Sequence, residues 1–206
     1  MNKPSRKELL IVRLSLVAVL VIGMGGYYLY KRMAIRPSFQ VKFETTKGDF
    51  VVSFYSRWAP NGVARVKELV EAGFYDDCRF FRVLSGFVVQ WGMNGDPNFN
   101  RRWMTDTIRD DPVIKSNRRG YVTFAKPETP HSRGTQLFVN LKDNLDLDEG
   151  SFAPVGLVAE GMDVVESFYA EYREDVNQDK IATAGNKYLD DIFPKLDYIK
   201  KATIIE

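Results

Sequence analysis

The sequence predicts a mainly β protein, with strands in a closed or sandwiched arrangement and two covering helices. Short segments in which apolar and polar residues alternate recur along the chain, and turn-forming Gly, Pro, Asn and Asp separate them. Two other segments carry apolar residues at helical spacing. With 206 residues, 45% hydrophobic and 27% charged, the chain is long enough for one domain with a substantial core.

An uncharged apolar run precedes this domain. The 17 residues Leu14–Tyr30 carry no charge, and basic residues flank them on both sides. At a rise of about 1.5 Å per residue, a helix over this run covers most of a bilayer core about 30 Å thick. We therefore expect a short basic segment at 1–13, a transmembrane helix at 14–30, a linker at 31–37 and a folded domain at 38–206.

A cleaved secretory signal is the competing interpretation of this run. It is disfavoured because the apolar part of such signals spans only about 7 to 15 residues, and because no small-residue cleavage site precedes Lys31. The short, basic start favours a cytoplasmic N terminus. We expect a single-pass membrane protein whose folded domain is extracytoplasmic, in the periplasm or an equivalent compartment.

The charge of the folded domain differs from that of the whole chain. The first 36 residues carry seven Lys and Arg and one acidic residue, so the remainder has 22 Lys and Arg against 26 Asp and Glu. This balance gives no electrostatic footprint for nucleic acid, and no nucleic-acid partner is expected. The single Cys78 excludes an internal disulfide, and its apolar surroundings favour a buried thiol.

The domain opens with a predicted hairpin, Phe39–Glu44 and Phe50–Tyr55, around a turn at 46–49. A helix then begins at Ala59-Pro60-Asn61 and ends at Gly73. The central stretch Phe80–Gly92 follows, two short apolar strands that contain a single Arg. The remaining expected elements are a surface excursion at 93–120, strands at 121–125, 135–140 and 152–158, a helix at 162–169, a loop at 171–185, a short helix at 186–192 and a last strand at 198–205 that pairs with the first.

Two ordered blocks give the domain a family resemblance. Phe80-Phe81-Arg82-Val83-x-x-Gly86-Phe87-Val88-x-Gln90-x-Gly92 and, downstream, Gly134-Thr135-Gln136-Leu137-Phe138-Val139 resemble the two signature blocks of the cyclophilins. These are peptidyl-prolyl cis/trans isomerases built on an eight-stranded antiparallel closed barrel capped by two helices. The resemblance covers roughly residues 39–172. It implies proline-containing polypeptides as clients and a monomer, with neither cofactor nor metal.

The resemblance also implies a role for each site residue. Rotation about an X-Pro bond makes and breaks no bond, so a catalyst needs a pocket for the proline ring and a donor directed at the amide. By resemblance Arg82 is that donor and Gln90 orients it. The residues implied for peptide binding are Phe87, Val88, Phe138 and Leu147 around the proline, Gln136 with the backbone near Ala125 and Lys126 along the peptide, and Phe152 beside the pocket.

The sequence departs from the family pattern at several positions. Phe81 and Phe152 stand where His is common, Lys126 replaces a usual Asn, and Trp91 replaces a usual Gly and is expected to crowd the floor of the site. The alternative function is therefore a non-catalytic proline-peptide-binding or chaperone module. A weaker alternative is a scaffold whose 93–120 excursion docks a partner.

Two other candidate sites are interpreted as surface features. His131, the only histidine, lies in a polar loop, and no nucleophile elbow accompanies it. Residues 175–186 imitate the start of a calcium loop, but Lys180 stands at the glycine position and Asn186 at the final glutamate position.

Overall fold

The structure is a computed structural model, and it describes residues 36–205. The predicted segments 1–13 and 14–30, and all but the last two residues of the predicted linker, lie outside the described residues. Residues 37–206 group into one compact unit. No helix within 36–205 combines the length and the apolar character that crossing a bilayer requires.

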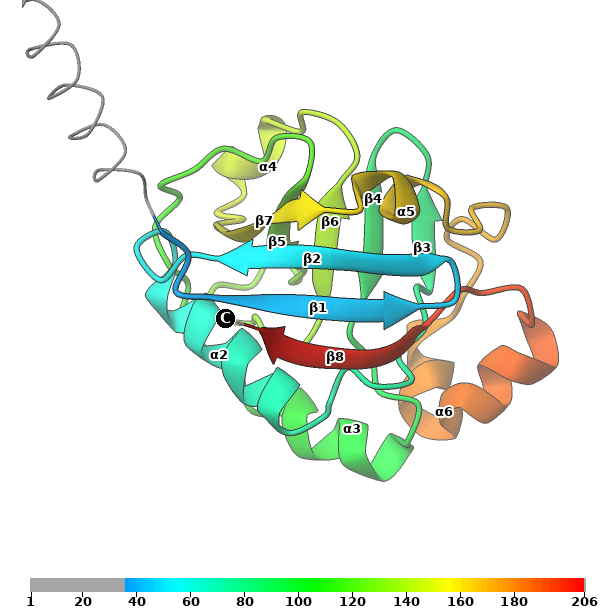
Figure 1. Cartoon of the computed structure of the whole chain (residues 1–206). Coiled ribbons are helices and arrows are strands. Elements are labelled where there is room, and N and C mark those ends of the chain that lie inside the picture. Colours follow the sequence, from blue (N-terminus) through cyan, green and yellow to red (C-terminus); the bar gives the residue numbers. More distant parts are fainter. Residues whose placement is uncertain (1–35, 206) are drawn as a thin grey trace, which may run out of the picture. The chain divides into compact units, whose positions relative to one another are not determined.

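Eight antiparallel strands form one curled sheet (Figure 1) in the order β3-β4-β6-β5-β7-β2-β1-β8. This confirms the mainly β prediction and the antiparallel arrangement. The strands are β1 (Phe39–Thr45), β2 (Gly48–Phe54), β3 (Arg82–Leu84), β4 (Val88–Trp91), β5 (Tyr121–Phe124), β6 (Leu137–Asn140), β7 (Pro154–Glu160) and β8 (Ile199–Ile205).

The two end strands of this order, β3 and β8, are connected where the residues before β3 contact the start of β8 and the residues just before it. Arg79 and Tyr198 form an isolated antiparallel bridge. The Ile199 amide donates to the Cys78 carbonyl at 2.9 Å, and the Phe80 amide donates to the Asp197 carbonyl, also at 2.9 Å. The predicted closed barrel is therefore observed as a curled sheet whose edges are joined between the residues before β3 and the start of β8.

Local sequence signals placed the first hairpin, the first helix and the last strand correctly. β1 and β2 pair from Phe39–Phe54 to Thr45–Gly48 around the predicted turn, and β8 pairs with β1. Helix α2 (Pro60–Glu71) buries Val63, Val66, Leu69 and Val70, as its spacing predicted. In Figure 1 it runs diagonally below β1 and β8.

The other helices differ from the prediction. The excursion 93–120 contains α3 (Pro97–Met104), and α4 (Asp146–Glu149) precedes β7. Helix α5 (Met162–Glu166) stops before the predicted 169. Helix α6 (Gln178–Ile192) takes up half of the predicted loop and is kinked at Gly185. The predicted short helix 186–192 is observed as the part of α6 that follows the kink. Helix α3 and the first part of α6 were missed, because side-chain caps at Asp96 and Asn177, rather than a continuous apolar period, mark their starts.

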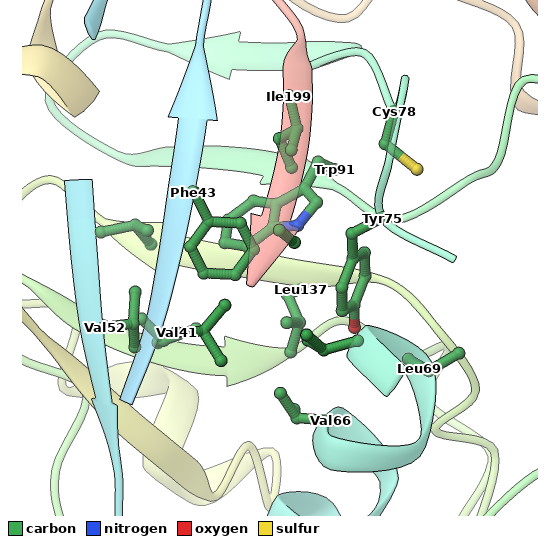
Figure 2. Packing of buried hydrophobic residues seen from close by; sticks show 14 of the residues in the cluster. Val41, Phe43, Val52, Val66, Leu69, Tyr75, Cys78, Trp91, Leu137 and Ile199 are labelled. Carbon is green, nitrogen blue, oxygen red and sulfur yellow. The ribbon is translucent and has the colours of Figure 1, made fainter. Parts of the chain in front are cut away.

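The core is rich in aromatic rings, and Trp91 lies inside it (Figure 2) between Phe43 and Tyr75. The Trp91 side chain is fully buried, and its ring centroid lies 5.8 Å from that of Phe43 and 5.7 Å from that of Phe80, both edge-on. Successive side chains of a strand point to opposite faces, so Trp91 points into the core where Gln90 points out. The expectation that Trp91 crowds the floor of the site is wrong.

A buried ion pair holds the first helix in place. The N-cap residue of α2, Ala59, has no side chain that could accept a hydrogen bond from the free amides of the helix. Instead, Asp111 accepts from the amides of Asn61 at 3.0 Å and Gly62 at 2.8 Å, and pairs with Arg133 at 3.0 Å. The side chains of Asp111 and Arg133 are each 1% exposed. A carboxylate at this position satisfies free helix amides and suits the positive end of the helix dipole.

We predict that Asp111→Asn lowers the free energy of unfolding by about 3 kcal/mol, because it leaves the buried Arg133 cation without its main partner. This is the low end of the usual cost, since Asp110 Oδ1 still lies 3.2 Å from Arg133 Nε. Urea unfolding measures the change. As a control, Asp191→Asn breaks the exposed Lys187–Asp191 pair and should shift stability by less than about 0.5 kcal/mol. Equal effects of the two variants would contradict the prediction.

Candidate functional site

Three neighbouring strands present the predicted catalytic and pocket residues on the outer face of the sheet. Arg82 on β3 pairs with Gln90 on β4, which pairs in turn with Phe138 on β6. The residues next to them, Val83, Val89 and Val139, belong to the core. Strand alternation therefore separates the site from the core.

A cavity of about 210 Å³ lies over these strands. A second cavity of about 370 Å³ adjoins it and shares Gln90, Ala125 and Lys126 with it. The structure thus brings all ten predicted site residues together. The smaller cavity is lined by Arg82, Phe87, Val88, Gln90, Ala125, Lys126, Phe138, Leu147 and Phe152, and the larger one adds Gln136.

The Arg82 guanidinium is held at the edge of the smaller cavity. Its Nη1 donates to Gln90 Oε1 at 3.3 Å, its Nε donates to Glu174 Oε1 at 2.8 Å, and its Nη2 also contacts Glu174 Oε1. The guanidinium carbon lies 5.6 Å from the ring centroid of Phe87. The side chain keeps 26% of its surface exposed. A permanently charged donor is therefore fixed beside an apolar pocket, with part of it free to meet a ligand.

Gln90 connects Arg82 to the second cavity. Its amide Nε2 donates to Gln136 Oε1 at 2.7 Å, and Gln136 Nε2 donates to Gln178 Oε1 at 3.1 Å. The backbone of Gly92 lies close to the backbone that carries Gln136. A Cβ at Gly92 would lie 2.4 Å from the Thr135 carbonyl oxygen. Gly92 also has φ +107°, so glycine is required there on both counts.

Leu147 and Phe152 reach the pocket from α4 and the segment after it. Asn117 Nδ2 donates to Asp148 Oδ1 and to the Phe152 carbonyl, each at 2.8 Å. The Phe152 ring meets Phe138 edge-on, with centroids 6.2 Å apart. This wall of the pocket therefore depends on an internal amide, Asn117, which is fully buried.

Comparison with known proteins identifies this arrangement. The family model described as "Cyclophilin type peptidyl-prolyl cis-trans isomerase/CLD" matches residues 40–186. The chain belongs to the cyclophilin family.

Curated relatives and solved structures agree with this membership. Peptidyl-prolyl cis-trans isomerase B of Escherichia coli (strain K12) is 30% identical over 149 residues, which are 68% of this chain and 90% of that protein. A probable peptidyl-prolyl cis-trans isomerase of Brucella abortus (strain 2308) is 29% identical over 187 residues, 84% of this chain and 95% of that protein.

Two solved cyclophilins show the same fold. A Cryptosporidium parvum enzyme superposes with TM-score 0.60 at 19% identity, covering 82% of this chain and 98% of its own. A Hirschia baltica cyclophilin gives TM-score 0.60 at 22% identity, covering 82% of this chain and 74% of its own. The Cryptosporidium enzyme was also solved in the presence of the dipeptide Ala-Pro, with TM-score 0.58, 19% identity and coverage of 81% and 99%.

The departures of this cyclophilin from the signature pattern have structural partners. Lys126 Nζ lies 5.2 Å from the ring centroid of Phe152, so two of the departures face each other in a cation–π contact. Phe81 is 2% exposed, and it packs in a second hydrophobic cluster with residues of the C-terminal segment. An apolar residue suits position 81 because that segment covers it.

Glu174 and Gln178 are the site residues that the sequence did not reveal. They lie in a stretch interpreted as a solvated loop, and local patterning says nothing of their contact with Arg82 and Gln136. One signal was available: Val176 and Ile181 are apolar residues in an otherwise polar stretch, and both are buried.

The structure places His131 and most of residues 175–186 at the surface. The His131 side chain is 62% exposed, and its Nδ1 accepts from the Asp110 amide at 3.0 Å. The calcium-like stretch runs into α6 instead of forming a loop. In the described part of the chain, no group of three or more His, Cys, Asp or Glu is arranged to hold a metal ion.

The pocket wall should give a pH signature. Burial raises the pKa of Asp148, but hydrogen bonds from the side chain and backbone of Asn117 outweigh burial and hold that pKa below its ordinary value of 3.8. Because the folded pKa is the lower one, the stabilisation is present above the unfolded pKa and is lost as the pH falls through the folded pKa.

We therefore predict that Asp148→Asn costs stability near neutral pH and that this difference from wild type shrinks below about pH 4. Urea midpoints of both proteins at about pH 6 and about pH 3 measure it. A difference that stays constant between the two pH values would contradict the assignment.

Proposed function

We propose that this cyclophilin domain, as a monomer, catalyses cis/trans isomerisation of X-Pro bonds in polypeptides, with Arg82 as the catalytic residue. The observation that most directly supports this proposal is the position of the Arg82 guanidinium, which lies at the edge of an apolar cavity of about 210 Å³ and contacts Gln90 there. Family membership supports the same activity. The Ala-Pro dipeptide associated with the Cryptosporidium structure supports proline-containing peptides as ligands of this fold.

The chemistry follows from the origin of the barrier. Amide resonance opposes rotation by about 18–20 kcal/mol, whereas the two X-Pro isomers differ by only about 0.5–1 kcal/mol. With the proline ring held by Phe87, Val88 and Phe138, the guanidinium can bind the proline carbonyl and donate to the imide nitrogen as resonance is lost. Charge-directed donors in a water-poor site commonly lower barriers by several kcal/mol.

The neighbouring cavity holds the polypeptide in this proposal. Gln136 and the backbone of Ala125 and Lys126 line it, directly beside the pocket. Because the proline carbonyl is bound at Arg82, the part of the chain before the proline passes along this second cavity. The client therefore spans both cavities, and the X-Pro bond that rotates lies between them.

We predict that Arg82→Ala reduces kcat/KM for an X-Pro peptide by about 10²–10³-fold, the usual effect of removing a directed donor. Arg82→Lys should recover only part of this loss, because an ammonium lacks the planar donor array. A coupled isomerisation assay with the 38–206 domain, preceded by a circular-dichroism check of folding, measures it. Arg119→Ala, at an exposed pair with Glu166, serves as the control. Equal rates for wild type and Arg82→Ala would refute the role.

The alternative is a peptide-binding module without catalysis. One observation favours it: Glu174 already occupies the Nε and Nη2 side of Arg82. NMR separates the two functions, because a catalyst accelerates exchange between the cis and trans signals of the peptide. A binding module shifts these signals and leaves the exchange rate unchanged.

We also propose that residues 14–30 anchor the domain to a membrane, with residues 38–206 extracytoplasmic. The support is the 17-residue uncharged run and its basic flanks. The full chain should sediment with membranes and resist extraction by high salt, whereas a chain that begins at residue 38 should stay in the supernatant. Mass spectrometry of the native N terminus checks for cleavage, and a mature chain that starts after residue 30 would exclude a retained anchor.

A further inference from the structure

The segment between α5 and α6 is part of the site wall. Residues 171–177, here called the tail loop, place Glu174 on Arg82, and Gln178 directly after them contacts Gln136. Val176, between these two polar residues, is only 7% exposed and packs in the second hydrophobic cluster with Phe81 and Ile181. The tail loop is therefore anchored by apolar packing, and the positions of Glu174 and Gln178 follow from that anchor.

These contacts form a continuous chain of hydrogen bonds that begins and ends at this segment. Glu174 accepts from Arg82, Arg82 donates to Gln90, Gln90 donates to Gln136, and Gln136 donates to Gln178. Both glutamines of the two signature blocks and the catalytic arginine are thus connected to the tail loop. The only carboxylate in this chain of contacts is that of Glu174.

The Glu174 carboxylate is available to a bound peptide. The Glu174 side chain is 59% exposed, although its Oε1 contacts Nε and Nη2 of Arg82. On the proposed function, the proline carbonyl is bound at Arg82. The residue that follows the proline begins at this carbonyl, so its side chain leaves the site on the Arg82 side, where Glu174 lies. Lys126 lies instead among the residues shared by both cavities.

We propose that Glu174 is a specificity-determining residue, which makes the site prefer clients with Lys or Arg directly after the proline over clients with Asp or Glu there. The proposal rests on the proposed function, because it uses the placement of the proline carbonyl at Arg82. The carboxylate attracts a cation and repels an anion in the ground state and in the transition state alike. The preference should therefore reside in KM, with kcat nearly unchanged.

The size of the preference follows from the exposure of Glu174. Water and salt screen an exposed carboxylate, so its effect on one neighbouring charge is modest, about fivefold in kcat/KM between the two peptides. Added salt should reduce it, because the interacting charges are accessible to counter-ions.

The test compares two peptides that are identical except for Lys or Glu after the proline. NMR exchange measurements at several peptide concentrations give kcat and KM for the full chain as wild type, Glu174→Gln and Glu171→Gln. Glu174→Gln keeps the size and an acceptor oxygen but removes the charge. Glu171→Gln removes an exposed charge from the same tail loop and is the matched control. We expect about a fivefold preference for the Lys peptide in wild type and in Glu171→Gln, and none in Glu174→Gln.

Failure of this proposal and failure of the proposed function give different results. If wild type accelerates exchange of both peptides equally, or if Glu174→Gln keeps the preference, the role of Glu174 is overturned and the isomerase function stands. If neither peptide exchanges faster, the isomerase function fails. Titration of peptide chemical shifts then compares the two dissociation constants, and equal constants for wild type would overturn the charge preference as well.

Discussion

The buried ion pair between Arg133 and Asp111 joins parts of the chain that are far apart in sequence. It connects the start of α2, the excursion 93–120 and the segment that leads into β6. Removing two charges from water costs free energy unless hydrogen bonds compensate for the lost hydration. Here two backbone amides of α2 donate to the Asp111 carboxylate. The neighbouring Asp110 extends the contact to Lys126, whose Nζ lies 3.9 Å away. Lys126, which lines both cavities, is therefore attached to the same buried charges.

Short-range sequence patterns predicted the elements whose formation depends on alternation within one strand or on one apolar helix face. They gave the first hairpin, α2 and β8, and the family resemblance added residues that the structure gathers around two adjoining cavities. The same alternation could have placed Trp91 in the core, since Gln90 next to it faces outward. Glu174 and Gln178 could not be found in this way, because their positions depend on packing of the tail loop against Phe81, a contact between distant segments.

The unusual residues of this cyclophilin form matched sets. Lys126 and Phe152 stand where Asn and His are common in the family, and they contact each other, so the pocket has a cation close to an aromatic ring. Phe81 is an apolar residue at a position where His is common, and the tail loop and α6 cover it. The Arg82–Gln90 pair persists within these changes. The Arg82–Gln90 pair thus stands between two sets of unusual residues, of which only Phe81 is covered by the C-terminal segment.

Arg82 lies on a strand of three residues that, among the described strands, has a partner on one side only. Such a strand opens more easily than the rest of a sheet, and its amides exchange with solvent through small local fluctuations. The side chain of Arg82 is held on its open flank by Glu174 rather than by a neighbouring strand. The position of the Arg82 guanidinium therefore depends on a surface segment as well as on Gln90, and the timescale on which this side chain rearranges can differ from that on which the sheet itself unfolds.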